Sequence, residues 1–254
     1  MLIKNKSYKS NGKSKLIIAL VVCVSITAAA VITTAVLLYN GVIHFNHIDR
    51  SRYPVVGVDV SSYQGEIDWD ELSTQNINFA YIKATEGSGF VDEHFEYNWE
   101  QASKTDLRIG AYHFFSFETT GKEQAENFCK VVPKTDDMLP PVIDVEYYGR
   151  FKTKDNIDAA TVAGNLREMV DVLEAEYEKK PIIYVSKETY ETIICDDFDD
   201  CKLWYRSVYS KVPADVDWTI WQYSNRTKLN GYNGREKFID MNVFRGNLEE
   251  FDSL

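Results

Sequence analysis

The sequence predicts an α/β protein, an irregular (β/α) barrel preceded by one N-terminal transmembrane helix. After residue 54, short apolar segments rich in β-branched residues alternate with segments of helical periodicity, which is typical of βαβ units around a parallel sheet. Eight such strands occur over about 200 residues, and eight strands close a barrel. The last three strands leave no room for full helices between them, so we expect the second half of the barrel to be irregular.

The elements of this barrel are placed by the apolar pattern. The strands are expected at residues 55–60, 79–83, 108–114, 141–146, 181–185, 203–206, 218–223 and 238–240. The helices between them are expected at about 68–75, 94–104, 120–132 and 158–177. The longest helix carries one apolar face at helical spacing, formed by Val162, Leu166, Met169, Val170 and Leu173.

The N-terminal region predicts a membrane anchor. Residues 1–15 carry five lysines and no acid, and Leu16–Leu38 is uncharged. These 23 residues are long enough to cross a bilayer core of about 30 Å, whereas a secretory signal has an apolar region of only about 7 to 15 residues. The small residues at 27–30 leave a cleaved signal as the alternative. The lysines predict a cytoplasmic N-terminus, so the link at 39–54 and the domain at 55–254 would lie outside the cell membrane.

The charge of the outer part limits its partners. All 39 acidic residues lie beyond the span, together with 23 of the 28 basic ones, so this part has a net charge of −16. Such a surface argues against nucleic acid or another polyanion as the main partner.

Cys195 and Cys201 bracket an acidic loop, and an extracellular location permits a disulfide between them. No zinc or EF-hand spacing is present, so no metal site is expected, and the sequence names no protein partner.

Two acids end the expected strand at 141–146. Asp144 and Glu146 are two residues apart, so both side chains leave the same face of the strand. Burying two like charges side by side is costly, and such conflicts occur more often at working sites than elsewhere. The alternative is a strand end at which both acids simply reach solvent.

Other polar residues also fall at strand ends. In a parallel barrel these ends share one face, where active sites are built. Each residue alone has a structural explanation: Lys83 could pair with Glu86, His113 could be a buried core histidine, and Trp204 and Trp221 could be core. Together with nearby aromatic residues they fit a sugar site instead. The set comprises Asp59, Lys83, Glu86, His113, Asp144, Glu146, Gln222 and Asp240.

Eight short motifs occur in the order found in a known family. They are Gly57–Ser61, Gln64–Gly65, Ile67–Trp69, Ile82–Gly87, Gly110–Phe114, Asp144–Glu146, Trp221–Tyr223 and Asp240–Asn242. With them, the segment from about Val55 to Phe244 resembles the glycoside hydrolase family 25 lysozymes, the Chalaropsis-type N-acetylmuramidases. Two positions depart from the family pattern: Arg206 stands where an alanine is usual, and Asp106 replaces a frequent glycine.

The resemblance implies a flattened, irregular barrel that needs no cofactor and cleaves the β-1,4 bond from N-acetylmuramic acid to N-acetylglucosamine in peptidoglycan glycan strands. It implies Glu146 as general acid, with Asp144 orienting the substrate's 2-acetamido group or steadying the charged transition state. Asp59 and Asp240 match the family's two other active-site acids. The expected substrate contacts are Tyr112, Lys83, His113, Trp204, Trp221 and Gln222.

Three other functions stay open from the sequence alone: a wall-binding module without activity, a hydrolase of chitin or another acetamido-sugar polymer, and a membrane-tethered structural protein. A tether favours local remodelling of the wall by the bacterial cell that makes the enzyme.

The stereochemistry of the cleavage, retaining or inverting, also stays open. Strand geometry separates Asp144 from Glu146 by about 6.6 Å, and side-chain freedom spans the roughly 5 to 9.5 Å of retaining and inverting enzymes.

Overall fold

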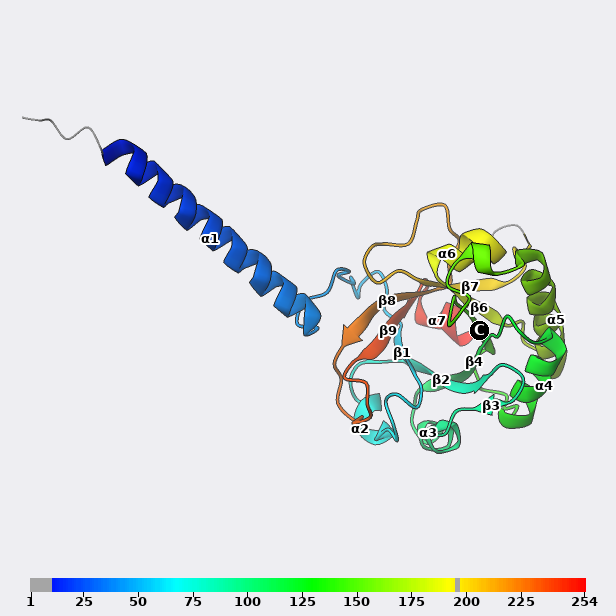
Figure 1. Ribbon diagram of the computed structural model, residues 1–254. Coiled ribbons are helices and arrows are strands. Elements are labelled where there is room, and N and C mark those ends of the chain that lie inside the picture. The colour runs from blue at the N-terminus through cyan, green and yellow to red at the C-terminus, as the bar shows by residue number, and fades with distance from the viewer. Residues whose placement is uncertain (1–10, 195–196) are drawn as a thin grey trace, which may run out of the picture. The chain divides into compact units, whose positions relative to one another are not determined.

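The computed structural model describes residues 11–194 and 197–254 and divides into two compact units, Met1–Ile43 and His44–Leu254 (Figure 1). Helix α1 (Asn11–Tyr39) forms most of the described part of the first unit. Its segment Lys13–Tyr39 is long and apolar enough to cross a membrane, and the span expected at Leu16–Leu38 lies within it. The second unit holds all other elements.

The second unit is a closed barrel of eight strands. The strand order is β1-β9-β8-β7-β6-β5-β4-β2, and pairing between β1 and β2 closes the circle, with β3 added as an outer flap on β2. The eight strands agree with the prediction to within a few residues at most ends. Their bounds are β1 (Val56–Val60), β2 (Phe79–Glu86), β4 (Arg108–Phe114), β5 (Val142–Val145), β6 (Ile182–Val185), β7 (Lys202–Arg206), β8 (Ile220–Thr227) and β9 (Ile239–Phe244), and the flap β3 is Phe90–Val91.

The direction of the last strand differs from the expected parallel barrel. Strand β9 runs antiparallel to both of its neighbours, β8 and β1. A hairpin without a helix joins β8 to β9, and such a short connection cannot bring the chain back for a parallel pairing. The start of β9 therefore meets the carboxyl ends of the other strands, which places Asp240 on the same rim as Asp59.

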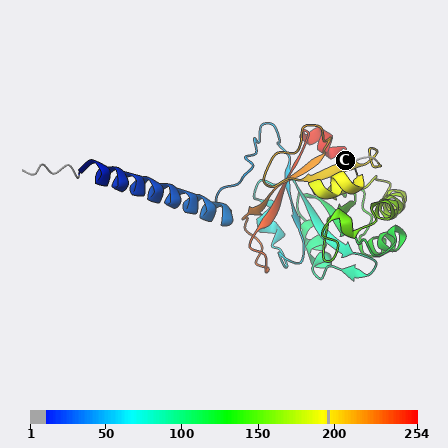
Figure 2. The ribbon, with the colours of Figure 1, turned by 45° about the horizontal axis from the view of Figure 1, so that its top comes forward.

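Helices cover the outside of the barrel, and Figures 1 and 2 show α4 (Gly121–Val131) and α5 (Ala159–Tyr177) lying side by side on one flank. Thr120 and Glu123 form a capping box at the start of α4, and Asp158 caps the start of α5. The helices are α2 (Trp69–Ser73), α3 (Phe95–Ala102), α4 (Gly121–Val131), α5 (Ala159–Tyr177), α6 (Lys187–Thr189) and α7 (Leu248–Asp252), with a 3₁₀ turn at Lys154–Asn156 and a π-helical turn at Tyr190–Ile194. The sequence did not predict α6, α7, β3 or the two turns, which are all short.

Large aromatic side chains fill the barrel interior below the carboxyl-end rim. The rings of Tyr81 and Trp204 lie 5.0 Å apart between their centroids, and Phe79 packs on Phe251 of α7 at 5.2 Å. A Cβ atom at Gly57 would overlap the Phe79 ring, so only glycine leaves room for this packing. The barrel is therefore a filled core that is plugged at its lower end by α7.

The expected link at 39–54 is packed on the barrel from His44 onward. Asn46 is buried, and its Nδ2 donates to the backbone oxygens of Ser207 at 2.8 Å and Tyr223 at 3.0 Å. Phe45 stacks edge-on against Tyr209. The domain therefore begins earlier than residue 55. The expected Cys195–Cys201 pair includes Cys195, which lies outside the described residues.

Candidate active site

A pocket with a volume of about 630 Å³ opens at the rim where the parallel strands end. Most of the site residues predicted from the sequence line it. These are Asp59, Lys83, Glu86, Tyr112, Asp144, Glu146, Trp204, Gln222 and Asp240. Within residues 11–194 and 197–254, no group of acids, histidines and cysteines is arranged to hold a metal ion.

Asp59 and Asp240 form one half of the pocket floor. They are register partners on β1 and β9, and Gln222 Nε2 donates to Oδ2 of both, at 3.0 and 3.3 Å. Tyr184 donates its hydroxyl to Gln222 Oε1 at 2.9 Å. Because a hydroxyl donor occupies the amide oxygen, the amide nitrogen must face the acids.

A second amide supports the same floor. Asn242 Nδ2 donates to Asp59 Oδ2 at 2.7 Å, and Asn242 Oδ1 accepts from Trp204 Nε1 at 2.9 Å. The indole nitrogen can only donate, which fixes the orientation of this amide too. Trp204 lines the pocket but is only 1% exposed, so a large part of its role is to hold Asn242.

Asp144 and Glu146 form the other half of the floor. Asp144 is 9% exposed, and its buried Oδ1 has no hydrogen-bond partner within residues 11–194 and 197–254. Among the described residues, the Glu146 carboxyl also accepts no hydrogen bond and forms no ion pair. An unpartnered buried carboxyl oxygen is unusual in a folded protein and marks a place where a ligand's donor can bind.

Burial raises the pKa values of all four floor acids. The charge of Glu146 adds to the rise in the pKa of Asp144, and the charge of Asp59 adds to the rise for Glu146. Hydrogen bonds from Asn242 and Gln222 partly oppose the effect of burial on the pKa of Asp59. The Arg206 guanidinium also lines the pocket, and its positive charge lowers the pKa of each of the four floor acids. Neighbouring carboxyls that repel one another lose their protons one after another, so the floor as a set keeps part of its protons to unusually high pH while other members are ionised.

Lys83 lies on the pocket wall as an ion-pair partner. Its Nζ lies 2.8 Å from Glu86 Oε2 and 5.6 and 5.1 Å from the ring centres of Phe90 and Phe114. The structural explanation that the sequence left open for Lys83 therefore holds, although the residue also faces the pocket.

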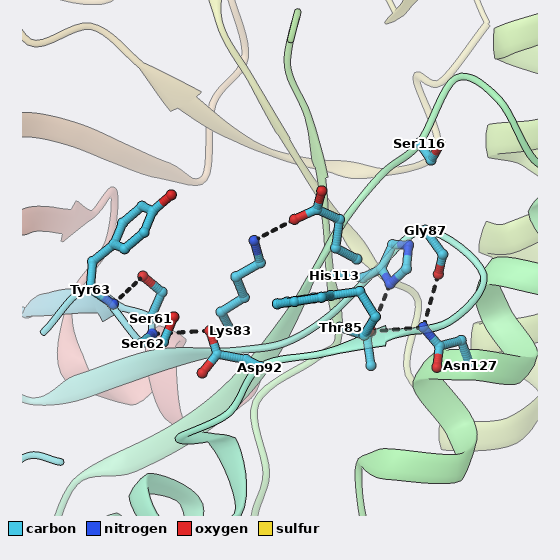
Figure 3. A network of polar contacts seen from close by, with 12 residues as sticks. Ser61, Ser62, Tyr63, Lys83, Thr85, Gly87, Asp92, His113, Ser116 and Asn127 are labelled. Carbon is cyan, nitrogen blue, oxygen red and sulfur yellow. Dashed lines mark hydrogen bonds and ion pairs between the residues drawn. The ribbon is translucent and has the colours of Figure 1, made fainter. Parts of the chain in front are cut away.

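Two residues expected at the substrate lie elsewhere. His113 is fully buried, with Nδ1 2.7 Å from Thr85 Oγ1 (Figure 3). Its Nε2 lies 3.0 Å from Gln124 Oε1. Burial lowers the pKa of His113 to about 4, so the ring is neutral. Trp221 is 4% exposed and donates Nε1 to the Ser207 oxygen at 3.0 Å. Neither residue lines the pocket. We correct both assignments: these side chains leave the opposite face of their strands from the pocket.

The sequence reasoning missed several residues of the site. Asn242 stands two positions after Asp240. Arg206, noted above only as a departure from the family pattern, stands two positions after Trp204, so strand alternation places each pair on one face. The same rule applied to β6 would have identified Tyr184. Tyr63, Tyr148 and Phe238 come from loops or the start of a strand and gave no comparable signal.

Comparison with known proteins supports this description. Residues 58–232 match the family described as glycosyl hydrolases family 25. Over 211 residues the chain is 33% identical to YegX of Escherichia coli K12, which covers 80% of this chain and 74% of that protein. Lysozyme M1 of Streptomyces globisporus is 28% identical over 227 residues, covering 79% and 71% of the two chains.

Solved structures agree. A family 25 glycosyl hydrolase from Bacillus anthracis matches with a TM-score of 0.77 and 52% identity, covering 83% of this chain and 97% of that one. The lysozyme from Streptomyces coelicolor matches with a TM-score of 0.71 and 27% identity, covering 79% and 96%.

A barrel with a carboxyl-floored, aromatic-walled pocket and these relatives is a glycoside hydrolase. The chain belongs to glycosyl hydrolases family 25, and within that family it is an enzyme of the lysozyme type.

Proposed function

We propose that this enzyme cleaves the β-1,4 bond between N-acetylmuramic acid and N-acetylglucosamine in peptidoglycan, with Glu146 as the general acid and Asp144 assisting. The observation that carries the proposal is the Glu146 carboxyl at the floor of the pocket, which has a raised pKa and no hydrogen-bond partner in the part of the chain that the structure describes. Relatives named lysozyme and N,O-diacetylmuramidase support the choice of substrate.

Glu146 would protonate the glycosidic oxygen as it leaves. This step needs a carboxyl that still holds its proton near neutral pH. Burial and the nearby charge of Asp59 raise the pKa of Glu146 in this sense. Because the carboxyl has no hydrogen-bond partner among the described residues, its proton is available to the substrate without breaking a bond in the protein.

Asp144 would assist through the substrate's 2-acetamido group. Its buried Oδ1 lacks a donor, and the acetamido N–H is a donor on the sugar beside the scissile bond. A hydrogen bond between them would turn the acetamido oxygen toward the anomeric carbon, as substrate assistance requires. A negative charge on Asp144 would also stabilise the oxocarbenium-like transition state.

The remaining residues would position the sugars. Asp59 and Asp240, held by Gln222 and Asn242, present carboxyl oxygens to sugar hydroxyls or to the attacking water. Tyr112 offers aromatic surface on the pocket wall, and the buried Trp204 acts through Asn242.

We further propose that α1 stays attached as a signal anchor, with residues 1–15 in the cytoplasm and the catalytic domain outside. The length and apolar character of Lys13–Tyr39 and the lysines that precede it support this orientation. A tethered enzyme would cut the wall only near its anchor, which suits local remodelling.

The reaction is tested by digesting purified peptidoglycan with the full-length chain in detergent and analysing the products by mass spectrometry. We expect new reducing ends on muramic acid. New reducing ends on glucosamine would mean that the enzyme cuts the bond from N-acetylglucosamine to N-acetylmuramic acid. If no new reducing end of either kind appears, the proposal is contradicted. Digestion of chitin oligosaccharides at a comparable rate would instead favour a broader acetamido-sugar hydrolase.

A further inference from the structure

The hairpin between β8 and β9 concentrates positive charge on one wall of the pocket. Residues 225–238 carry four basic residues and a single acid, although the region beyond the membrane span has a net charge of −16. We call Arg226, Lys228, Arg235 and Lys237 the cationic rim. None of these four belongs to the catalytic arrangement described above.

The cationic rim is gathered on two aromatic rings that line the pocket. Arg226 Cζ, Lys228 Nζ and Lys237 Nζ lie 5.3, 5.7 and 5.4 Å from the centre of the Phe238 ring. Arg235 Cζ lies 4.1 Å from the centre of the Tyr63 ring. Phe238, Tyr63 and Arg226 all line the pocket, so the positive charge starts at its wall and extends outward through exposed side chains.

The hairpin that carries the rim is fixed to the rest of the barrel. Its backbone is bound to the loop after β1 by hydrogen bonds from Gly234 N to Gln64 O at 3.0 Å and from Glu236 N to Tyr63 O at 2.9 Å. A Cβ atom at Gly234 would overlap the backbone of that loop. Gly231 O also accepts from Asp68 N at the start of α2, where Figure 1 shows the hairpin beside that helix. The rim therefore holds a set position beside the acids.

The chemistry of the substrate suggests what this rim binds. The sugars of the glycan carry hydroxyls and acetamido groups, which need the polar and acidic floor and no cation. Peptide branches leave the same glycan at alternate sugars, and they carry carboxylates. A ligand for a rim continuous with the pocket wall should be attached to the sugar in the pocket, which favours these branches over a separate phosphate polymer.

We propose that the cationic rim binds carboxylates of the peptide branches while the glycan occupies the pocket, so that the enzyme acts preferentially on peptide-bearing strands. This inference rests on the proposed peptidoglycan substrate. Binding outside the reacting bond lowers KM with little effect on kcat, and it weakens as salt rises.

The test compares two soluble glycan fragments that carry identical peptide branches, one with free carboxylates and one with those groups amidated. The full-length chain in detergent is assayed beside the triple variant Lys228→Gln, Arg235→Gln, Lys237→Gln. A matched control, Lys122→Gln, Lys130→Gln, Lys154→Gln, removes three exposed lysines that do not line the pocket.

For the unmodified chain and the control we expect a KM about five- to tenfold lower on the carboxylate substrate, from three exposed charge pairs. The rim variant should show the same KM on both substrates. Equal KM values for both substrates in the unmodified chain would overturn the inference while leaving the proposed reaction intact, and no cleavage of either would count against the reaction itself. If a soluble glycerol-phosphate polymer inhibits the unmodified chain but not the rim variant, and substrate charge has no effect, the rim serves that polymer instead.

Discussion

Asp59 and Asp240 lie opposite each other on antiparallel strands and share one donor, because Gln222 Nε2 donates to Oδ2 of both. This arrangement depends on the reversed direction of β9, which brings the start of that strand to the rim. Two neighbouring carboxyls on one amide favour a state in which at least one holds a proton. Both pKa values are raised, with burial as the main cause.

Replacing Glu146 by glutamine should lower kcat by roughly 10²- to 10⁴-fold, because the amide keeps the size of the carboxyl but cannot deliver a proton. Circular dichroism and binding to insoluble wall should be unchanged. Glu126→Gln on the exposed face of α4 is the matched control and should keep normal turnover. Full activity in Glu146→Gln would refute its role as general acid.

Replacing Asp144 by asparagine should lower kcat by roughly 10²- to 10³-fold, since a charge beside the developing cation is lost. The interaction between the two carboxyls is reciprocal, so removing Asp144 should also lower the pKa of Glu146. In the remaining activity, the loss of rate at high pH should therefore begin at lower pH. A normal rate with an unshifted pH profile would instead make Asp59 or Asp240 the second carboxylate.

Replacing Arg206 by alanine should move the pH profile in the other direction. Its guanidinium lowers the pKa values of the four floor acids, so without it Glu146 keeps its proton to higher pH. The loss of rate at high pH should begin at higher pH in Arg206→Ala, and Arg206→Lys should restore most of the original profile because the charge is kept. Identical profiles in all three proteins would show that Arg206 acts only by its shape.

Two glycine substitutions should change stability with opposite signs. Gly57→Ala places a methyl group on the Phe79 ring inside the barrel and should cost about 1–3 kcal/mol. Gly164→Ala lies within α5 with no atom near the added methyl and should stabilise by about 0.5–1 kcal/mol. Urea unfolding followed by circular dichroism measures both. Equal stability of Gly57→Ala and the parent would contradict the described packing.

The membrane anchor is tested on intact cells. If α1 is an uncleaved anchor with the domain outside, protease added to intact cells should remove the domain. Cytoplasmic proteins should stay undigested, which shows that the membrane has remained intact. Protection of the domain would reverse the proposed orientation. A mature protein that begins near Val31 would show that the segment is a cleaved signal.

The sequence predicted the barrel well because its strands are short apolar runs between clear helical segments. It could not give the direction of β9, because the apolar pattern of a strand is the same for parallel and antiparallel pairing. Only the short connection between β8 and β9 indicates that β9 pairs antiparallel. The acids of the floor were found because strand-end carboxyls are conspicuous.

Strand ends alone do not tell which face a side chain leaves, and this accounts for the two misplaced residues. On β4, Tyr112 faces the pocket while its neighbour His113 points away and is held by Thr85 and Gln124. On β8, Gln222 faces the pocket while Trp221 points away. The rule that successive side chains point to opposite faces of a strand would have assigned only Tyr112 and Gln222 to the pocket. Residues supplied by loops, such as Tyr63, reach the pocket through long-range contacts that no local pattern encodes.

The plug at the lower end of the barrel limits how a polymer can reach the acids. Phe251 packs against Phe79 and Phe244, and Arg108 binds the backbone oxygens of Phe251 and Leu254. No chain can pass along the barrel axis through this filled end. A glycan must therefore lie across the open mouth, and after the cut both halves leave by the side from which the strand arrived.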